Sequence, residues 1–229
     1  MSEERPAADR TSGVRIDELV LADEPARWAA LGFALEGDRL RLGDLSLRIA
    51  GEDAGRGILG WSLRGISCTE LDGLPTSLSD AGLESPAAPA PAHPNGIVAI
   101  DHVVAMTPAL DRSIAALQAA GLDLRRVREQ PTPAGAPRQA FFRLGAEILE
   151  LVQEPEQAIA AREDGAQRGA RLWGLAFVAP DLDRTVAALG EQVGEAREAV
   201  QPGRRIATVR RSAGLAVPVA LMSPKQQPR

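Results

Sequence analysis

Two polar side chains stand within apolar segments that read as β-strands near the middle of the chain. His102 lies in a β-branched run, where strand alternation predicts that it shares a face with Ile100 and Val104. Glu150 lies in a second apolar run. An imidazole or a carboxylate on an apolar face needs a partner, because burying it unpaired costs several kcal/mol. Each of the two side chains therefore needs either a hydrogen-bonding or ionic partner or a divalent metal ion.

Three arginines on neighbouring strand-like segments are further candidates. Arg138, Arg143 and Arg205 lie where strand alternation can send only some of the side chains inward. A strand arginine is usually a solvated residue of the outer face. One that faces a cleft would instead suit a carboxylate or phosphate group of a ligand. We therefore take Arg138, Arg143 and Arg205, together with His102 and Glu150, as candidate ligand-binding residues.

The other residues with reactive side chains add little. The second histidine, His93, lies in a proline-rich stretch and is expected to be a solvent-exposed loop residue. The single cysteine, Cys68, cannot form an intramolecular disulfide, and nothing in its neighbourhood marks it as a reactive thiolate. Catalytic residues therefore stay unassigned.

Composition narrows the classes of protein. The chain has 229 residues, 45% of them hydrophobic, which allows one large or two small domains with a sizeable core. A net charge of -5 and a pI near 5.2 argue against a nucleic-acid or anionic-membrane surface. No signal peptide is visible at the start, and no apolar run approaches the length of a membrane span. We expect a cytoplasmic protein.

The same unit is written twice between residues 97 and 224. Segment 100–112 aligns with segment 172–184, so that Asp111 falls on Asp183. In each copy the pattern predicts a strand, a helix and three further strands, in the order βαβββ. The first copy spans residues 97–153 and the second spans 172–223.

A shortened copy precedes a linker. Residues 14–84 are expected to form a reduced N-terminal βαβββ-like unit, in which 58–66 reads as the opening strand of a further, decayed unit. Residues 85–96 are rich in proline and alanine and are expected to form a stiff, extended spacer. Residues 97–224 then form the domain of two complete units.

These units resemble the vicinal oxygen chelate superfamily, which includes glyoxalase I, bleomycin-resistance proteins and extradiol dioxygenases. The resemblance rests on an Ile-Asp-His-Val opening at 100–103 and an Ile-Leu-Glu-Leu-Val closing strand at 148–152. It covers residues 95–224 well and 14–66 weakly. It implies an α+β fold in which tandem βαβββ units form a curled mixed sheet around one cleft. It also implies metal ligands on the first and fourth strands of each unit, facing the cleft.

Carried onto this chain, those ligand positions are only half filled. The first unit supplies His102 and Glu150, whereas Gly174 and Ala220 stand at the matching positions of the second unit. Catalytic metal sites usually keep three protein ligands and an open position. Two ligands are therefore too few for firmly held Zn, Ni, Mn or Fe.

The reduced N-terminal unit carries a different pair at the same positions. Glu18 stands where His102 does, and Arg48 stands where Glu150 does. Opposite charges there predict an ion pair in place of a metal and a structural unit without an active site. We expect this unit to cover the tandem domain within one chain or to make a homodimer contact, because an unpaired sheet edge invites association.

Two functional classes follow. In the first, the protein binds a small organic molecule in its cleft without a firmly held metal, as the bleomycin-resistance branch does. In the second, it is a divalent-metal-dependent lyase, isomerase or dioxygenase of the glyoxalase or dioxygenase type, using His102 and Glu150 for Lewis-acid action. The dioxygenase version is weaker, because that branch has two histidines and one carboxylate. We favour the binding protein and keep the enzyme as the alternative.

Overall fold

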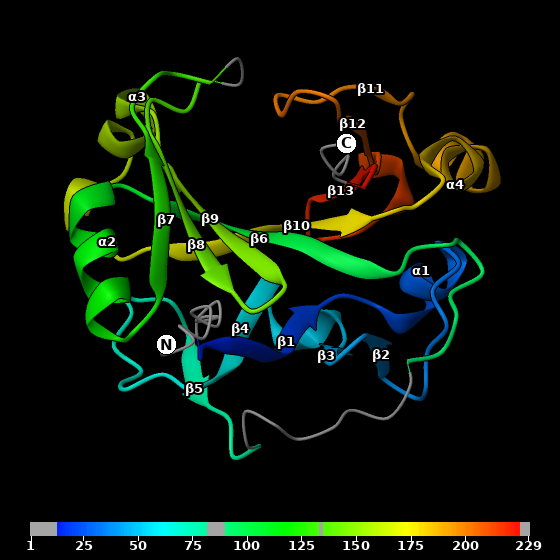
Figure 1. The fold of residues 1–229 in the computed structure, drawn as a ribbon, viewed down its shortest axis with the longest axis horizontal. Helices are drawn as coiled ribbons and strands as arrows, with labels where there is room; N and C mark the ends of the chain where they lie inside the picture. Colours follow the sequence, from blue (N-terminus) through cyan, green and yellow to red (C-terminus); the bar gives the residue numbers. More distant parts are fainter. Residues whose placement is uncertain (1–12, 82–89, 133–134, 225–229) are drawn as a thin grey trace, which may run out of the picture.

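The computed structural model describes residues 13–81, 90–132 and 135–224, which form two mixed β-sheets flanked by short helices (Figure 1). One sheet has eight strands and the other has five. No helix in these ranges is long and apolar enough to cross a membrane. The two mixed sheets with short helices confirm the predicted α+β class.

The first complete unit has the predicted order βαβββ. Its elements are β6 (Ala99–Thr107), α2 (Leu110–Ala119), β7 (Asp123–Arg128), β8 (Gln139–Leu144) and β9 (Glu147–Gln153). The helix buries Leu110 and Leu117, seven residues apart, against the strands. Strand β9 lies parallel to β6, so the first and fourth strands of the unit are neighbours.

The second unit repeats this order with shorter strands. After α3 (Glu156–Ala160) it consists of β10 (Arg171–Val178), α4 (Leu182–Leu189), β11 (Arg197–Glu198), β12 (Arg205–Thr208) and β13 (Val219–Met222). The carboxylate of Asp181 caps α4 by accepting a hydrogen bond from the backbone N–H of Arg184. Strands β6 and β10 pair antiparallel at the centre, which gives the order β11-β12-β13-β10-β6-β9-β8-β7. Tandem units thus build one mixed sheet, as predicted.

The N-terminal sheet is a reduced version of the same arrangement. Its elements are β1 (Arg15–Ala22), α1 (Pro25–Ala30), β2 (Arg39–Leu42), β3 (Leu45–Ile49), β4 (Gly57–Arg64) and β5 (Thr76–Leu78). Strand β3 lies parallel to β1, and β4 lies antiparallel to β1 with β5 parallel beside it. Strands β4 and β5 therefore match the first and fourth strands of a further unit, as β10 and β13 do in the large sheet.

The two sheets also share their register. Glu18 on β1 pairs with Ser62 on β4, just as His102 on β6 pairs with Ala176 on β10. The register shifts place one extra residue in each of the four first strands, directly before the position equivalent to His102. These four bulge residues are Asp17, Leu59, Asp101 and Trp173. Repetition of one irregularity in four strands supports the interpretation of four related units.

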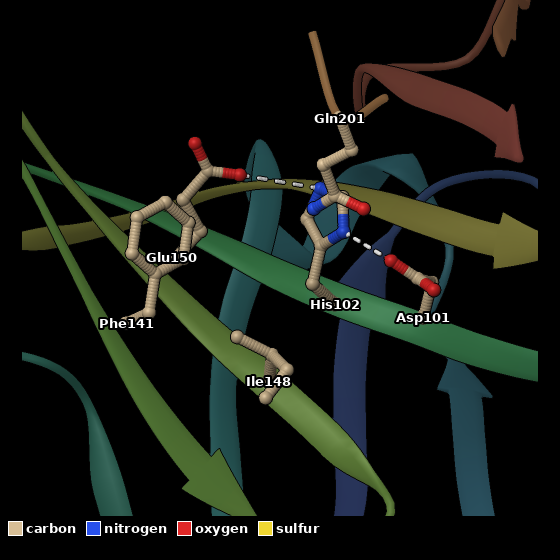
Figure 2. Close-up of a pocket in the computed structure, with 6 residues that line it drawn as sticks. All are labelled: Asp101, His102, Phe141, Ile148, Glu150 and Gln201. Atoms are coloured by element: carbon tan, nitrogen blue, oxygen red, sulfur yellow. Dashed lines mark hydrogen bonds and ion pairs between the residues drawn. The ribbon is translucent and has the colours of Figure 1, made fainter. Parts of the chain in front are cut away.

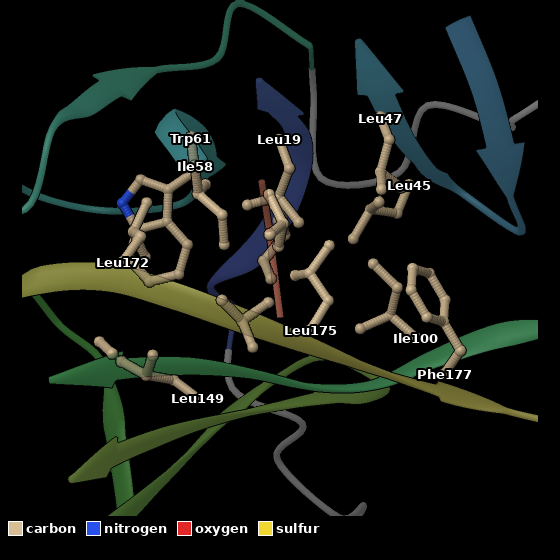
Figure 3. Close-up of a cluster of buried hydrophobic side chains, with 14 of the residues drawn as sticks. Leu19, Leu45, Leu47, Ile58, Trp61, Ile100, Leu149, Leu172, Leu175 and Phe177 are labelled. Carbon is tan, nitrogen blue, oxygen red and sulfur yellow. The ribbon is translucent and has the colours of Figure 1, made fainter. Parts of the chain in front are cut away.

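The bulge at Asp101 changes the direction in which Ile100 points. Ile100 pairs with Phe177 and His102 pairs with Ala176, so Asp101 is the extra residue. Ile100 is only 4% exposed and joins the hydrophobic core, where Figure 3 shows it beside Phe177. The expectation that Ile100 and His102 share a face is therefore wrong, because strict alternation holds only in a strand without a bulge.

One hydrophobic core lies between the two sheets. Leu19 and Leu47 of the five-stranded sheet point toward Leu175 and Phe177 of the eight-stranded sheet (Figure 3). Trp28 of α1 closes the core, with its ring centroid 6.1 Å from that of Phe177. The N-terminal sheet thus covers the tandem units within the same chain, which was one of the two expected arrangements. The homodimer contact remains a prediction.

The described end of the linker is packed against the N-terminal unit. His93 is only 7% exposed; its Nδ1 accepts the N–H of Ala34 at 3.0 Å, and its Nε2 lies 2.9 Å from the carbonyl oxygen of Arg41. Asn95 donates to the carbonyl of Leu31 at 2.8 Å. The expectation of a solvent-exposed His93 is wrong, because the chain turns inward before β6. Residues 85–89 of the expected spacer lie outside the described residues, and the division at 85–96 remains a proposal.

A close strand approach recurs in the two units that lack ligand-type side chains. The carbonyl oxygen of Pro218 accepts the N–H of Leu175 at 3.0 Å, and a Cβ on Gly174 would lie 3.0 Å from that oxygen. The N-terminal sheet repeats this, since a Cβ on Gly60 would lie 2.9 Å from the carbonyl oxygen of Pro75. A side chain at either glycine would need the backbone to move.

We therefore expect Gly174→Ala and Gly60→Ala each to lower the free energy of unfolding by about 1–3 kcal/mol, because the methyl group overlaps a fixed backbone oxygen. Gly194→Ala is a matched control, since its Cβ would lie at an ordinary 3.6 Å from the carbonyl oxygen of Thr208. Urea unfolding would measure all three. Equal urea midpoints for Gly174→Ala and Gly194→Ala would contradict this prediction, because the backbone at Pro218 would then move away from position 174 without loss of stability.

Candidate functional site

A small cavity opens on the face of the large sheet that points away from the core. Its volume is about 90 Å³. Most of its wall belongs to the first unit, and Gln201 reaches over it from the loop between β11 and β12 of the second unit (Figure 2). The lining residues are Asp101, His102, Phe141, Ile148, Glu150 and Gln201.

The side chains of His102 and Glu150 converge in this cavity, as the sequence predicted. The distance between Nε2 of His102 and Oε2 of Glu150 is 3.4 Å. The other ring nitrogen, Nδ1, lies 2.8 Å from Oδ2 of Asp101 (Figure 2). Both nitrogens of the imidazole thus have a carboxylate neighbour: Nδ1 is hydrogen-bonded to Asp101, and Nε2 lies within ion-pair distance of Glu150.

Asp101 is held in turn by Arg204, a residue that the sequence analysis did not single out. The guanidinium contacts both carboxylate oxygens, at 2.7 and 3.1 Å, and Arg204 is only 3% exposed. Burial alone would raise the pKa of Asp101, but the hydrogen bonds from His102 and Arg204 outweigh it and hold this pKa well below its usual value. An ionised Asp101 can only accept, so Nδ1 of His102 carries the donated proton.

Glu150 has the opposite electrostatic environment. Burial raises its pKa, and the positive charges of His102 and Arg128 offset that effect only in part. Its other carboxylate oxygen, Oε1, accepts a hydrogen bond from the side-chain amide of Gln139. Because Nδ1 of His102 already donates to Asp101, one proton can reside either on Nε2 or on Glu150. Such a pair can donate or accept a proton toward a bound molecule.

The three candidate arginines separate into two groups. Arg138 pairs with Asp111 of α2 and with Glu129, outside the cavity. Arg205 pairs in the equivalent way with Asp183 of α4. Arg143 instead opposes Ile148 of the cavity wall across β8 and β9, so it shares the cavity face of the sheet. Arg138 directly precedes β8 and shares the alternation of the buried Ala140 and Phe142, so it lies toward α2, on the face opposite the cavity.

The donor set does not fit a firmly held metal. A separation of 3.4 Å would allow Nε2 of His102 and Oε2 of Glu150 to bind one ion side by side, since such bonds are about 2.0–2.2 Å long. Gly174 and Ala220 add no donor, and the Pro218 carbonyl leaves no room for a side chain at position 174. No group of three His, Cys, Asp or Glu suited to a metal occurs within residues 13–81, 90–132 and 135–224.

The equivalent face of the N-terminal sheet contains the predicted ion pair. Nε of Arg48 lies 3.4 Å from Oε1 of Glu18, and Arg39 contacts the other carboxylate oxygen. An open groove of about 540 Å³ runs past this pair and between β1, β4 and β5. Glu18 is thus neutralised by arginines of the chain itself.

Comparison with known proteins gives likeness in structure alone. No protein-family model matches the chain, and no curated protein matches it. A xylose isomerase-like TIM barrel/4-hydroxyphenylpyruvate dioxygenase fusion protein superposes with a TM-score of 0.61 at 16% identity, over 99% of this chain and 51% of that one. Methylmalonyl-CoA epimerase from Mycobacterium tuberculosis gives 0.45 at 20% identity, over 57% of this chain and 91% of that one. The first likeness extends through both sheets and shows the fold, and this chain spans about half of that fusion protein.

A variant without Arg204 should show how much free energy the burial of the charged Asp101 carboxylate costs. We expect Arg204→Met to lower the free energy of unfolding by roughly 3–5 kcal/mol at pH 7, because an uncompensated buried charge remains. This deficit should narrow as the pH falls toward about 4, since protonation of Asp101 then removes that charge. Arg205→Met is the matched control, because its partner Asp183 is exposed and little stability should be lost. A deficit that does not depend on pH would contradict the role of the Asp101 charge.

Proposed function

The chain has the vicinal oxygen chelate fold, and we propose that the cleft of its large sheet binds a small organic molecule without a firmly held metal. The observation that supports this proposal is the double engagement of His102. Its two ring nitrogens face Asp101 and Glu150, so the chain itself supplies a carboxylate neighbour to each nitrogen. A site arranged in this way leaves its open side to a ligand.

The size of the cavity limits what enters it. Pockets for whole small molecules usually measure about 300–1,000 Å³. The cavity of about 90 Å³ therefore suits one polar group of a ligand. The rest of the molecule would lie on the open sheet face, where Phe141 and Ile148 supply apolar contact.

The polar group of the ligand would meet Nε2 of His102 and Oε2 of Glu150. Asp101 and Arg204 hold the imidazole ring in place, so Nε2 keeps a constant direction. Gln139 fixes the far oxygen of Glu150. A carbonyl or hydroxyl oxygen near Oε2 and Nε2 could accept or donate one hydrogen bond there, whichever the ligand requires.

The alternative is a divalent-metal-dependent lyase, isomerase or dioxygenase. The separation of 3.4 Å between Nε2 of His102 and Oε2 of Glu150 is the observation that favours it. It is the weaker proposal, because Gly174 and Ala220 leave the second unit without a donor. An ion held by two side chains would have to take its other ligands from water or substrate.

Metal analysis separates these two proposals. After dialysis, we expect the purified protein to contain Zn, Ni, Mn and Fe at well below one ion per chain, because two ligands retain an ion weakly. A chelator should leave the melting temperature nearly unchanged. Stoichiometric metal together with a loss of stability on chelation would overturn the metal-free proposal and favour the enzyme.

Ligand binding can be followed through the two histidines of the chain. We expect small organic fragments that bind in the cleft to shift the NMR resonances of the His102 ring. The ring of His93, buried beside Phe33 at a centroid distance of 5.4 Å, should stay unmoved and serves as an internal reference. Fragments that bind without affecting His102 would place the ligand site elsewhere.

A further inference from the structure

We propose that this cleft selects organic oxyanions, with Arg126, Arg128 and Arg143 forming a subsite for a carboxylate or phosphate group beside His102 and Glu150. The inference rests on the proposed binding function and names the chemical class of the ligand. It depends on where the strand register places these three arginines and on the partners that the other arginines have.

A row of directly paired residues joins Arg126 to Glu150. Arg126 on β7 opposes Phe141 on β8, and Phe141 opposes Glu150 on β9. Directly opposed residues project to the same side of a sheet. Phe141 and Glu150 both line the cavity, so Arg126 lies on the cavity face, two strands from Glu150. At a strand spacing of about 4.8 Å, the two Cα atoms are roughly 10 Å apart.

A second row joins Arg143 to His102. Arg143 on β8 opposes Ile148 on β9, and Ile148 is the neighbour of His102 on β6. Arg143 therefore lies on the cavity face, again two strands from the reactive side chain. Ile148 between them is an apolar floor across which a small molecule can lie.

Arg128 is the third arginine of the subsite and belongs to a third row of paired residues. It opposes Gln139, the residue whose amide hydrogen-bonds to Glu150. Its positive charge acts on Glu150 and lowers the pKa of that carboxyl, although burial acts more strongly in the opposite direction. Arg128 and Arg143 are half-buried and Arg126 is exposed, so the subsite is open to solvent on one side.

Among the described residues, no salt bridge joins these three arginines to a carboxylate, unlike Arg125, Arg138 and Arg205. Arg138 and Arg205 lie on the helix-covered face of the sheet and pair with Asp111 and Asp183 of the helices. Asp123, which opposes Arg143, pairs with Arg125. The guanidinium groups of the cavity face are thus available to a ligand.

The charge of the cavity face is opposite to that of the protein as a whole. Asp101 is neutralised by Arg204, so this face of the sheet sets two carboxylates, Glu150 and the Asp123 that opposes Arg143, against the three arginines. The complete chain carries a net charge of -5. A planar guanidinium fork matches the two oxygens of a carboxylate or phosphate, which gives strong and directional hydrogen bonds. The anionic group would lie against the arginines, and a second polar group would reach His102 and Glu150.

The test compares anionic and neutral probes of the same shape on the full-length protein. Benzoate and phenylphosphate are titrated against benzamide, with the His102 ring resonances as the readout and His93 as the reference. We expect both anions to bind about tenfold more tightly than benzamide. Arg143→Gln and Arg128→Gln should each weaken the anions about fivefold and leave the affinity for benzamide unchanged.

Two further variants control for structure and geometry. Arg138→Gln removes an arginine that directly precedes β8 and lies on the helix-covered face, so it should change the affinity for neither class of probe. Arg143→Lys keeps the charge but loses the fork, so its affinity for phenylphosphate should fall between those of the wild type and Arg143→Gln. Melting temperatures confirm that each variant is folded.

The outcomes separate this inference from the function on which it rests. If benzamide binds as tightly as benzoate, or if Arg143→Gln and Arg128→Gln leave the anion affinities unchanged, the oxyanion subsite is wrong and the binding function stands. If no probe of either kind shifts the His102 resonances at millimolar concentration, the inference and the proposed binding function both fail.

Discussion

The buried ion pair between Arg204 and Asp101 is the interaction on which the site depends. Arg204 precedes β12 of the second unit and Asp101 stands on β6 of the first, so the pair joins the two units at the cavity. All five N–H groups of the guanidinium find acceptors, which are Asp101, Gln201 and the carbonyl of Ser223. Burying two charges costs desolvation energy that only such complete hydrogen bonding offsets. The orientation of His102, and through it the geometry with Glu150, follows from this pair.

The β-bulge explains why Asp101 can take part. In a regular strand, neighbouring residues point to opposite faces, so Asp101 would point away from His102. The extra residue in β6 brings both side chains to the same side and allows the 2.8 Å contact between them. The same bulge in β1 precedes Glu18, the residue equivalent to His102. There the polar side chain is paired with Arg48 instead of a carboxylate. One backbone irregularity thus supports two kinds of polar site in the same chain.

Much of the architecture was predictable because it follows from local patterns. Periodicity gave the βαβββ order, and the alignment of the copies matched His102 with Gly174 and Glu18, which the strand registers bear out. The burial of His93 was not predictable, because a proline-rich composition says nothing about what a segment packs against. Arg204 was missed for a related reason, since its partner Asp101 lies 103 positions away and becomes a neighbour only through the pairing of two units. Arg138 and Arg205 resembled cleft residues in sequence. Strand alternation instead places their side chains on the side of the helices.

The small number of metal-ligand side chains and the arginines of the cleft are related through the charges that the cleft must compensate. In a metal site of this geometry, a divalent cation would compensate the carboxylates around the imidazole. Here Arg204 compensates Asp101, and the imidazole of His102 lies 3.4 Å from the second carboxylate, that of Glu150. Position 174 cannot accept a ligand side chain without moving the Pro218 carbonyl, so the second unit cannot supply another donor without a change of backbone. The arginines of the chain therefore supply the positive charge that a metal ion would supply. A metal would place this charge at one point, whereas the arginines distribute it along β7 and β8. A cleft with this distribution suits a ligand that brings its own negative charge.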